Sequence, residues 1–119
     1  SKPVKNAAKQ TMKKNILDYF SIKSTLDELI KFGETEIANN LLDIINLNEL
    51  PKPENHNLKK DITTSYFEIN LSSENIDKIV DLFSELEVES LTENGESTIS
   101  TNHYVVLLDK WLKIQDEQN

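Results

Sequence analysis

The chain has 119 residues, a formal net charge of −8 and no cysteine. Its length suits one domain, and the absence of cysteine excludes disulfides, thiolate metal sites and thiol nucleophiles. No apolar run is long enough to cross a bilayer, and an acidic chain is poorly suited to bind phosphate groups. We therefore expect a soluble, cytoplasmic protein that needs no cofactor and binds neither nucleic acid nor membrane directly.

Residues 1–11 differ in composition from the rest of the chain. They contain three lysines, no acid and a single sizeable apolar side chain, Val4. Met12 follows at once and opens MKKNILDYF, which resembles a natural translation start. We expect residues 1–11 to be a leader added before the native start or, alternatively, a native flexible arm. Residues 12–119 are expected to form a single helical domain.

Helical spacing of apolar residues runs from Asn15 to Phe32. Ser24 and Thr25 are each followed three residues later by an acid, so a second helix could begin there. The sequence leaves open whether this segment forms one helix or two. Gly33 lies where a left-handed C-cap belongs. The apolar residues of this helical face are Ile16, Phe20, Ile22, Leu26, Leu29 and Ile30.

A second helix is expected after Gly33, with Thr35 as its N-cap. The short glycine turn between two helices predicts an αα-hairpin. Residues 49–61 follow, with two prolines and many charges, and are interpreted as an exposed connection. The apolar stripe of the second helix is Ile37, Ala38, Leu41, Leu42 and Ile45.

The segment SYFEINLS, residues 65–72, alternates apolar and polar residues as a strand does. Ser72 or Ser73 can then cap a helix. Residues 93–101, which include ENG and STIST, are a candidate partner for SYFEINL in a short β-ribbon, although two short strands alone are marginal. The apolar face of the helix is Ile76, Ile79, Val80, Phe83 and Leu86.

The last helix is expected at residues 102–114, capped by Ser100 or Thr101, and to be the most buried element. The chain as a whole is predicted to be mainly α, a compact helical bundle with an N-terminal αα-hairpin and at most one short β-ribbon. The apolar residues of the last helix are Tyr104, Val105, Val106, Leu107, Leu108, Trp111, Leu112 and Ile114.

Catalytic and metal-binding motifs are missing from the sequence. His56 and His103 lie far apart, and neither has an acid at metal-ligand spacing. There is no G-x-S-x-G or S-x-x-K pattern, and two glycines cannot form a phosphate-binding loop. We therefore expect structural roles for both histidines and a protein that is not an enzyme.

Acidic residues are concentrated between Glu68 and Glu96, where nine acids accompany one base, Lys78. Asp77, Asp81 and Glu85 are spaced four residues apart, which places them on one helix face. Like charges at this spacing destabilise an isolated helix by about 0.2–0.5 kcal/mol per pair. One interpretation is a solvated face that maintains solubility. The other is a surface that recognises a basic partner, with Glu74, Asp77, Asp81, Glu85, Glu87 and Glu89 as contacts and Tyr66 as a possible anchor.

Two segments, LDELIKFGETEIANNLLDII and INLSSENIDKIVDLFSELE, precede a tryptophan-containing C-terminal helix. In this order they resemble small immunity proteins of bacterial polymorphic toxin systems, in particular the Maf-type and contact-dependent growth inhibition groups. The resemblance covers most of residues 12–114, except the connection 49–61. It implies a cytoplasmic inhibitor, without enzymatic activity, that binds one cognate toxin domain, often a nuclease.

The main hypothesis is therefore an immunity protein whose acidic surface binds the basic substrate-binding surface of a nuclease toxin. An acidic regulatory or scaffold protein is the alternative. Such a protein, encoded by a phage or acting as a nucleic-acid mimic, would bind a basic cellular protein. A small enzyme with an unfamiliar site is a third hypothesis.

Overall fold

The structure is a computed structural model, which describes residues 15–53, 58 and 60–118. It confirms a mainly helical fold with one two-stranded sheet. The expectations for residues 1–11 and for His56 lie outside the described residues. In chain order the elements are β1 (Ile16–Asp18), α2 (Tyr19–Lys31), α3 (Thr35–Leu47), the 3-10 helix η1 (Ile62–Thr64), β2 (Tyr66–Glu68), α4 (Ser73–Glu89) and α5 (Ile99–Gln118).

The first helical unit begins later than its apolar spacing predicts. Residues 16–18 form strand β1, and α2 begins at Tyr19. Asp18 sets this start because its backbone is extended and its carboxylate accepts a hydrogen bond from the Ser21 N–H at 3.3 Å. The unit is one helix, since α2 continues through Thr25, whose hydroxyl donates to the Ser21 carbonyl.

Gly33 ends α2 as predicted, at a φ of +78°. The Gly33 N–H donates to the Ile30 carbonyl at 3.1 Å, and the Glu34 N–H donates to the Leu29 carbonyl at 2.8 Å. This pair of bonds is a Schellman motif, which needs the left-handed conformation that glycine adopts without strain. The αα-hairpin is therefore confirmed. The predicted N-cap is wrong, because Thr35 is the first residue of α3 and Glu34 before it makes no side-chain cap.

Three apolar residues of the predicted helix faces of this hairpin are exposed. Phe20 is 62% exposed, Ile30 58% and Leu42 42%. Each helix buries only one face against the rest of the protein, and these three positions lie outside it. The residues that are buried are Ser21, Ile22, Thr25, Leu26 and Leu29 on α2 and Ile37, Ala38, Leu41 and Ile44 on α3.

Strands β1 and β2 pair in antiparallel fashion, with Leu17 opposite Phe67. The alternation predicted for the second strand is confirmed, because Phe67, Ile69 and Leu71 are all buried. The predicted partner strand is wrong, since residues 93–98 form a turn followed by residues without regular secondary structure. The actual partner of β2 is β1, about fifty residues earlier in the chain. Strand β1 has only three residues, which are too few for a period of two to be recognised in the sequence.

Helix α4 agrees with its prediction. Ser72 is the N-cap, and its hydroxyl accepts a hydrogen bond from the Asn75 N–H at 3.1 Å. This bond satisfies one of the free N–H groups at the helix start. The predicted apolar face is buried, and it consists of Ile76, Ile79, Val80, Phe83 and Leu86.

Helix α5 differs from its prediction in its start and in its burial. The Thr98 hydroxyl accepts from the Thr101 N–H at 3.1 Å, and the Thr101 hydroxyl accepts from the Thr98 N–H at 3.0 Å. This reciprocal pair makes Thr98 the cap, in place of Ser100 or Thr101. The helix is not the most buried element. It buries four of its 20 residues, whereas α2 buries five of 13, and Val106 and Leu112 are exposed.

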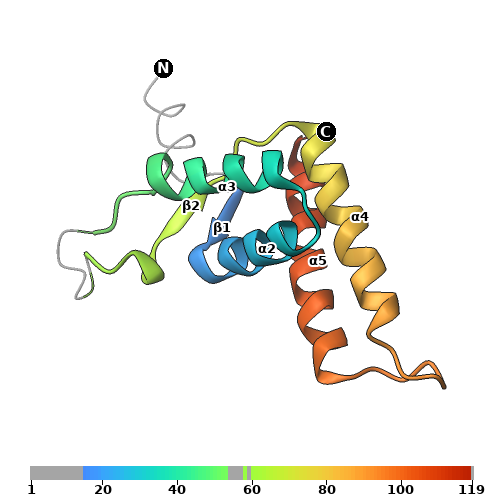
Figure 1. The fold of residues 1–119 in the computed structure, drawn as a ribbon. Helices are drawn as coiled ribbons and strands as arrows, with labels where there is room; N and C mark the ends of the chain where they lie inside the picture. Colours follow the sequence, from blue (N-terminus) through green and yellow to red (C-terminus); the bar gives the residue numbers. More distant parts are fainter. Residues whose placement is uncertain (1–14, 54–57, 59, 119) are drawn as a thin grey trace, which may run out of the picture.

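The two helical hairpins pack on each other around one hydrophobic core. Figure 1 shows the α2–α3 hairpin lying across one half of the α4–α5 hairpin, whose connecting turn projects beyond it. The small sheet lies beside α2 and α3. Trp111, Phe67 and Phe83 are the largest side chains that are fully buried in this core.

Candidate partner-binding surface

The predicted acidic stripe lies on α4, on the side away from the core. The buried face of α4 contributes to the core, while α4 packs lengthwise on α5. Residues three or four apart share a helix face, so the intervening carboxylates face solvent together. The structure thus brings four predicted contacts onto one exposed face, which we call the acidic stripe: Glu74, Asp77, Asp81 and Glu85.

The last two predicted carboxylates of α4 differ in position. Glu89 is exposed and borders a shallow hollow with Glu85 and Val88. Glu87 is half-buried, because it follows Val80 by seven residues and so lies on the same side of the helix. The residue that continues the acidic stripe beyond Glu85 is Val88, which is 67% exposed.

No ion pair neutralises the acidic stripe within the described residues. Two ion pairs occur there, Lys23 with Asp27 and Lys110 with Asp18. Lys78 is the single base of α4 and pairs with none of its carboxylates in that part of the chain. Asp77 accepts a hydrogen bond from the Gln115 amide of α5 at 2.7 Å and remains exposed. The stripe therefore presents its negative charge to solvent.

The α2–α3 turn adds two residues to this surface that sequence reasoning missed. Phe32 and Glu34 line a hollow of about 350 Å³ together with Lys78, Asp81, Leu82 and Glu85. Glu34 brings a third carboxylate beside Asp81 and Glu85. Phe32 is exposed, and the Lys31 ammonium lies 5.9 Å from its ring centroid, within cation–π range. No sequence pattern predicts this neighbourhood, because the turn and α4 meet only through the tertiary fold.

Tyr66, the proposed anchor, lies at a different place from the acidic stripe. It is 57% exposed and lines a cleft of about 480 Å³ between β1 and α5. The charged groups of that cleft are two lysines and two acids, Lys110, Lys113, Asp18 and Glu117. The cleft therefore does not extend the acidic surface, and the structure does not bring Tyr66 together with the carboxylates of α4.

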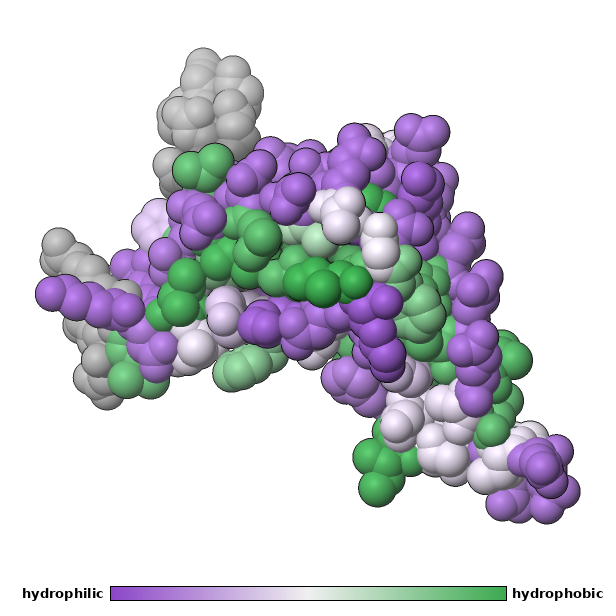
Figure 2. All heavy atoms as spheres, viewed as in Figure 1, coloured by the Kyte–Doolittle hydropathy of each residue, from purple (hydrophilic) through white to green (hydrophobic). Residues whose placement is uncertain are grey.

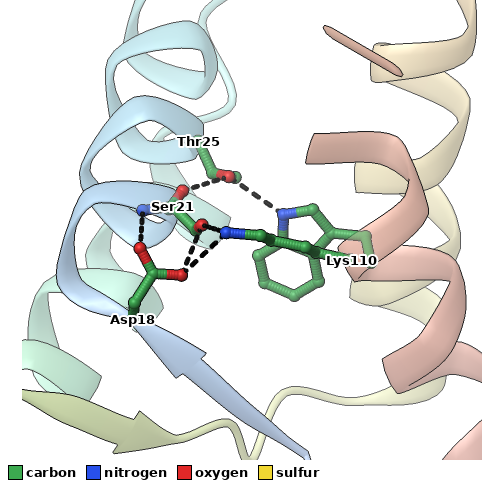
Figure 3. Close-up of polar contacts among 5 residues, drawn as sticks. Asp18, Ser21, Thr25 and Lys110 are labelled. Atoms are coloured by element: carbon green, nitrogen blue, oxygen red, sulfur yellow. Dashed lines mark hydrogen bonds and ion pairs between the residues drawn. The ribbon is translucent and has the colours of Figure 1, made fainter. Parts of the chain in front are cut away.

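A polar cluster joins α2 to α5 and supports the fold (Figure 3). The Lys110 ammonium donates to the Asp18 carboxylate at 3.0 Å and to the Ser21 hydroxyl at 2.7 Å. Burial alone would raise the pKa of Asp18, but hydrogen bonds from Ser21 and Lys110 and the Lys110 charge hold that pKa below 3.8. Close by, the Trp111 indole N–H donates to the Thr25 hydroxyl at 2.9 Å. Each polar group in this cluster has a partner that fixes it.

A second polar cleft lies where α4 and α5 meet the connecting turn. Tyr104 and Glu89 line it, beside the hydroxyl groups of Ser90 and Thr98. The pKa of Tyr104 is raised by burial and then by the Glu28 and Glu89 carboxylates. The Thr98 hydroxyl donates to the Ser90 carbonyl at 3.0 Å, and the Ser90 hydroxyl donates to the Glu87 carbonyl at 2.7 Å. These bonds close the turn.

No group of three or more His, Cys, Asp or Glu side chains on the described part of the chain is arranged to hold a metal ion. His103 is exposed, with its ring 5.6 Å from that of Tyr104. None of the helices described combines the length and the apolar character that crossing a membrane requires.

The fold and this surface define a small, mainly helical protein with an acidic helix face bordered by exposed apolar side chains. No protein-family model, curated protein or solved structure matches the chain.

Proposed function

We propose that the protein is an immunity protein without enzymatic activity, which binds and neutralises a cognate nuclease toxin domain through the acidic stripe. One observation carries this proposal. Asp77, Asp81 and Glu85 are exposed on one face of α4, with no ion pair among the described residues. Their mutual repulsion opposes helix stability, and the hydrogen bond from Gln115 involves Asp77 alone, so folding gives no reason for the grouping of all three. The likeness of the two helical segments to immunity proteins suggests the class.

The proposed mechanism is competition for the toxin's substrate-binding surface. Nucleases bind phosphates with basic side chains, and carboxylates of the acidic stripe would occupy the same positions. Complementary charge can raise association rates by about 10- to 1,000-fold. Val88 and Phe32, which are exposed beside these carboxylates, supply apolar area that would slow dissociation once the two surfaces meet.

The experiment compares association kinetics of two charge-matched variants with the partner recovered by pull-down from the source cells. Asp77→Asn, Asp81→Asn and Glu85→Gln together should slow association at least tenfold at low salt and weaken its salt dependence. Folding stability should stay equal or rise slightly, because repulsion along α4 is relieved.

The control removes the same number of charges from exposed acids elsewhere, with Glu36→Gln, Asp43→Asn and Glu93→Gln. It should leave association close to that of the native protein. Equal association rates for the stripe variant and the native protein, at both low and physiological salt, would reduce the acidic stripe to a solvated helix face.

A further inference from the structure

The α2–α3 hairpin has an apolar surface outside the core. Five of the twelve large hydrophobic residues that are exposed among the described residues belong to this hairpin. Figure 2 shows hydrophobic side chains gathered in a band along this hairpin, with hydrophilic side chains on both sides. We call this the hairpin band. The exposed apolar residues of the whole hairpin are Phe20, Ile30, Phe32, Leu42 and Leu47, and of these Ile30 and Leu42 represent the band.

Helical spacing connects this surface to the core beneath it. Ile30 follows the buried Leu26 by four residues, and Leu42 follows the buried Ala38 by four residues. Ile45, three residues after Leu42, is half-buried against the same core. Each helix therefore extends its apolar stripe beyond the part that the core covers. An exposed apolar surface bordered by polar residues is typical of an interaction site.

Charge around the hairpin band distinguishes between possible occupants. Residues 19–47 contain two lysines and five acids, a balance of −3. A second copy of the chain would bring the same negative charge against this one, which disfavours self-association. A helix that is apolar on one side and basic on the other would fill the band and meet the net negative charge of the hairpin with opposite charge.

We infer that the hairpin band binds a basic amphipathic helix of a partner protein. Helices α2 and α3 have 13 residues each, so the band offers a length of about 20 Å. A partner helix of about 13 residues would match this length, with apolar anchors three, four and seven residues apart. The inference does not rest on the acidic stripe, so either proposal can fail alone.

A synthetic helix provides the probe, since the natural partner is unidentified. The probe is a fluorescein-labelled peptide of about 14 leucine and lysine residues in helical periodicity, whose binding is measured by fluorescence anisotropy. A peptide of the same composition in scrambled order tests for charge attraction alone. Ile30→Ser with Leu42→Ser should weaken binding of the periodic peptide at least tenfold.

Two control variants test whether the peptide binds at the hairpin band and not elsewhere on the protein. Ile99→Ser with Val106→Ser changes two other exposed apolar residues, on α5, and should leave binding within about twofold of the native value. The acidic stripe variant, with Asp77→Asn, Asp81→Asn and Glu85→Gln, should retain most of the binding. Circular dichroism confirms folding, and amide chemical shifts of the labelled native protein should move on α2 and α3 when peptide is added.

Four results would overturn the inference. The first is equal binding of the scrambled and periodic peptides, and the second is full binding by the Ile30→Ser, Leu42→Ser variant. The third comes from sedimentation of the protein alone: a dimer that this variant dissociates would make a second copy the occupant. Amide shifts confined to α4 would likewise place the peptide on the acidic stripe and contradict the hairpin band.

Discussion

The indole of Trp111 is fully buried, yet it carries a polar N–H group. That group donates to the Thr25 hydroxyl, which itself donates to the Ser21 carbonyl at 2.8 Å. The buried donor is therefore satisfied, and so is the hydroxyl that accepts from it. The sequence predicts a core position for Trp111, and the structure confirms it. The role of Thr25 was not predicted, because a hydroxyl on a helix gives no sign of which buried group it will meet.

Two substitutions separate the packing of Trp111 from its hydrogen bond. Trp111→Ala should reduce the free energy of unfolding by about 3–5 kcal/mol, because it leaves a large cavity. Thr25→Val keeps the volume and removes the acceptor, so it should cost about 1–3 kcal/mol. Urea denaturation measures both. A Trp111→Ala protein of native stability would show that the ring is not part of the core.

At the level of secondary-structure elements, Asp18 makes two kinds of contact. It caps α2 through the Ser21 N–H, and it joins α2 to α5 through Lys110. Asparagine caps helices about as well as aspartate, so Asp18→Asn removes mainly the charge. The side chains of Lys110 and Asp18 are 40% and 32% exposed, and such pairs contribute about 0.2–1 kcal/mol. We expect a loss of stability within that range at neutral pH.

The stability that Asp18→Asn loses depends on pH because the pKa of Asp18 is lowered in the folded protein. The folded state binds this proton more weakly than the unfolded state. The contribution is therefore complete above the ordinary value of 3.8 and is lost as pH falls through the folded-state pKa. The stability difference between native protein and Asp18→Asn should narrow below about pH 4, as urea denaturation at several pH values would show. A difference that widens on acidification would contradict the assignment.

The burial of helix residues was predicted correctly where the apolar residues of a helix form a single narrow stripe. The five buried residues of α4 were all expected, since a single stripe faces the core. On α2 and α3 the predicted apolar stripes are wider than the buried face, so Phe20, Ile30 and Leu42 belong to the stripes and are nevertheless exposed. Hydrophobic spacing reports that a surface is apolar, and it does not report whether the same chain covers it.

The whole molecule carries a net charge of −8, so electrostatic repulsion acts on the compact state more strongly than on the expanded unfolded chain. Raising the salt concentration from about 0.01 M to 0.15 M shortens the screening length from about 30 Å to about 8 Å. We expect the thermal unfolding midpoint to rise by a few degrees, about what 1 kcal/mol gives in a protein of this size.

The same salt titration on the acidic stripe variant tests where the repulsion arises. With three charges removed from α4, the rise in the midpoint should be smaller than in the native protein. Differential scanning calorimetry of both proteins gives the comparison. An identical rise would show that repulsion is spread over the surface, with no special contribution from the acidic stripe.

The sequence by itself determined the mainly helical class, the αα-hairpin around Gly33 and the exposed carboxylates of α4. These features depend on contacts within a few residues, such as a glycine that adopts positive φ or side chains that repeat every three to four positions. Only the tertiary structure decided the β1–β2 pairing, the position of Phe32 and Glu34 beside α4, and the separation of Tyr66 from the acidic stripe. Each of these joins or separates segments far apart in the chain, and their relative positions follow from how the two hairpins share one core.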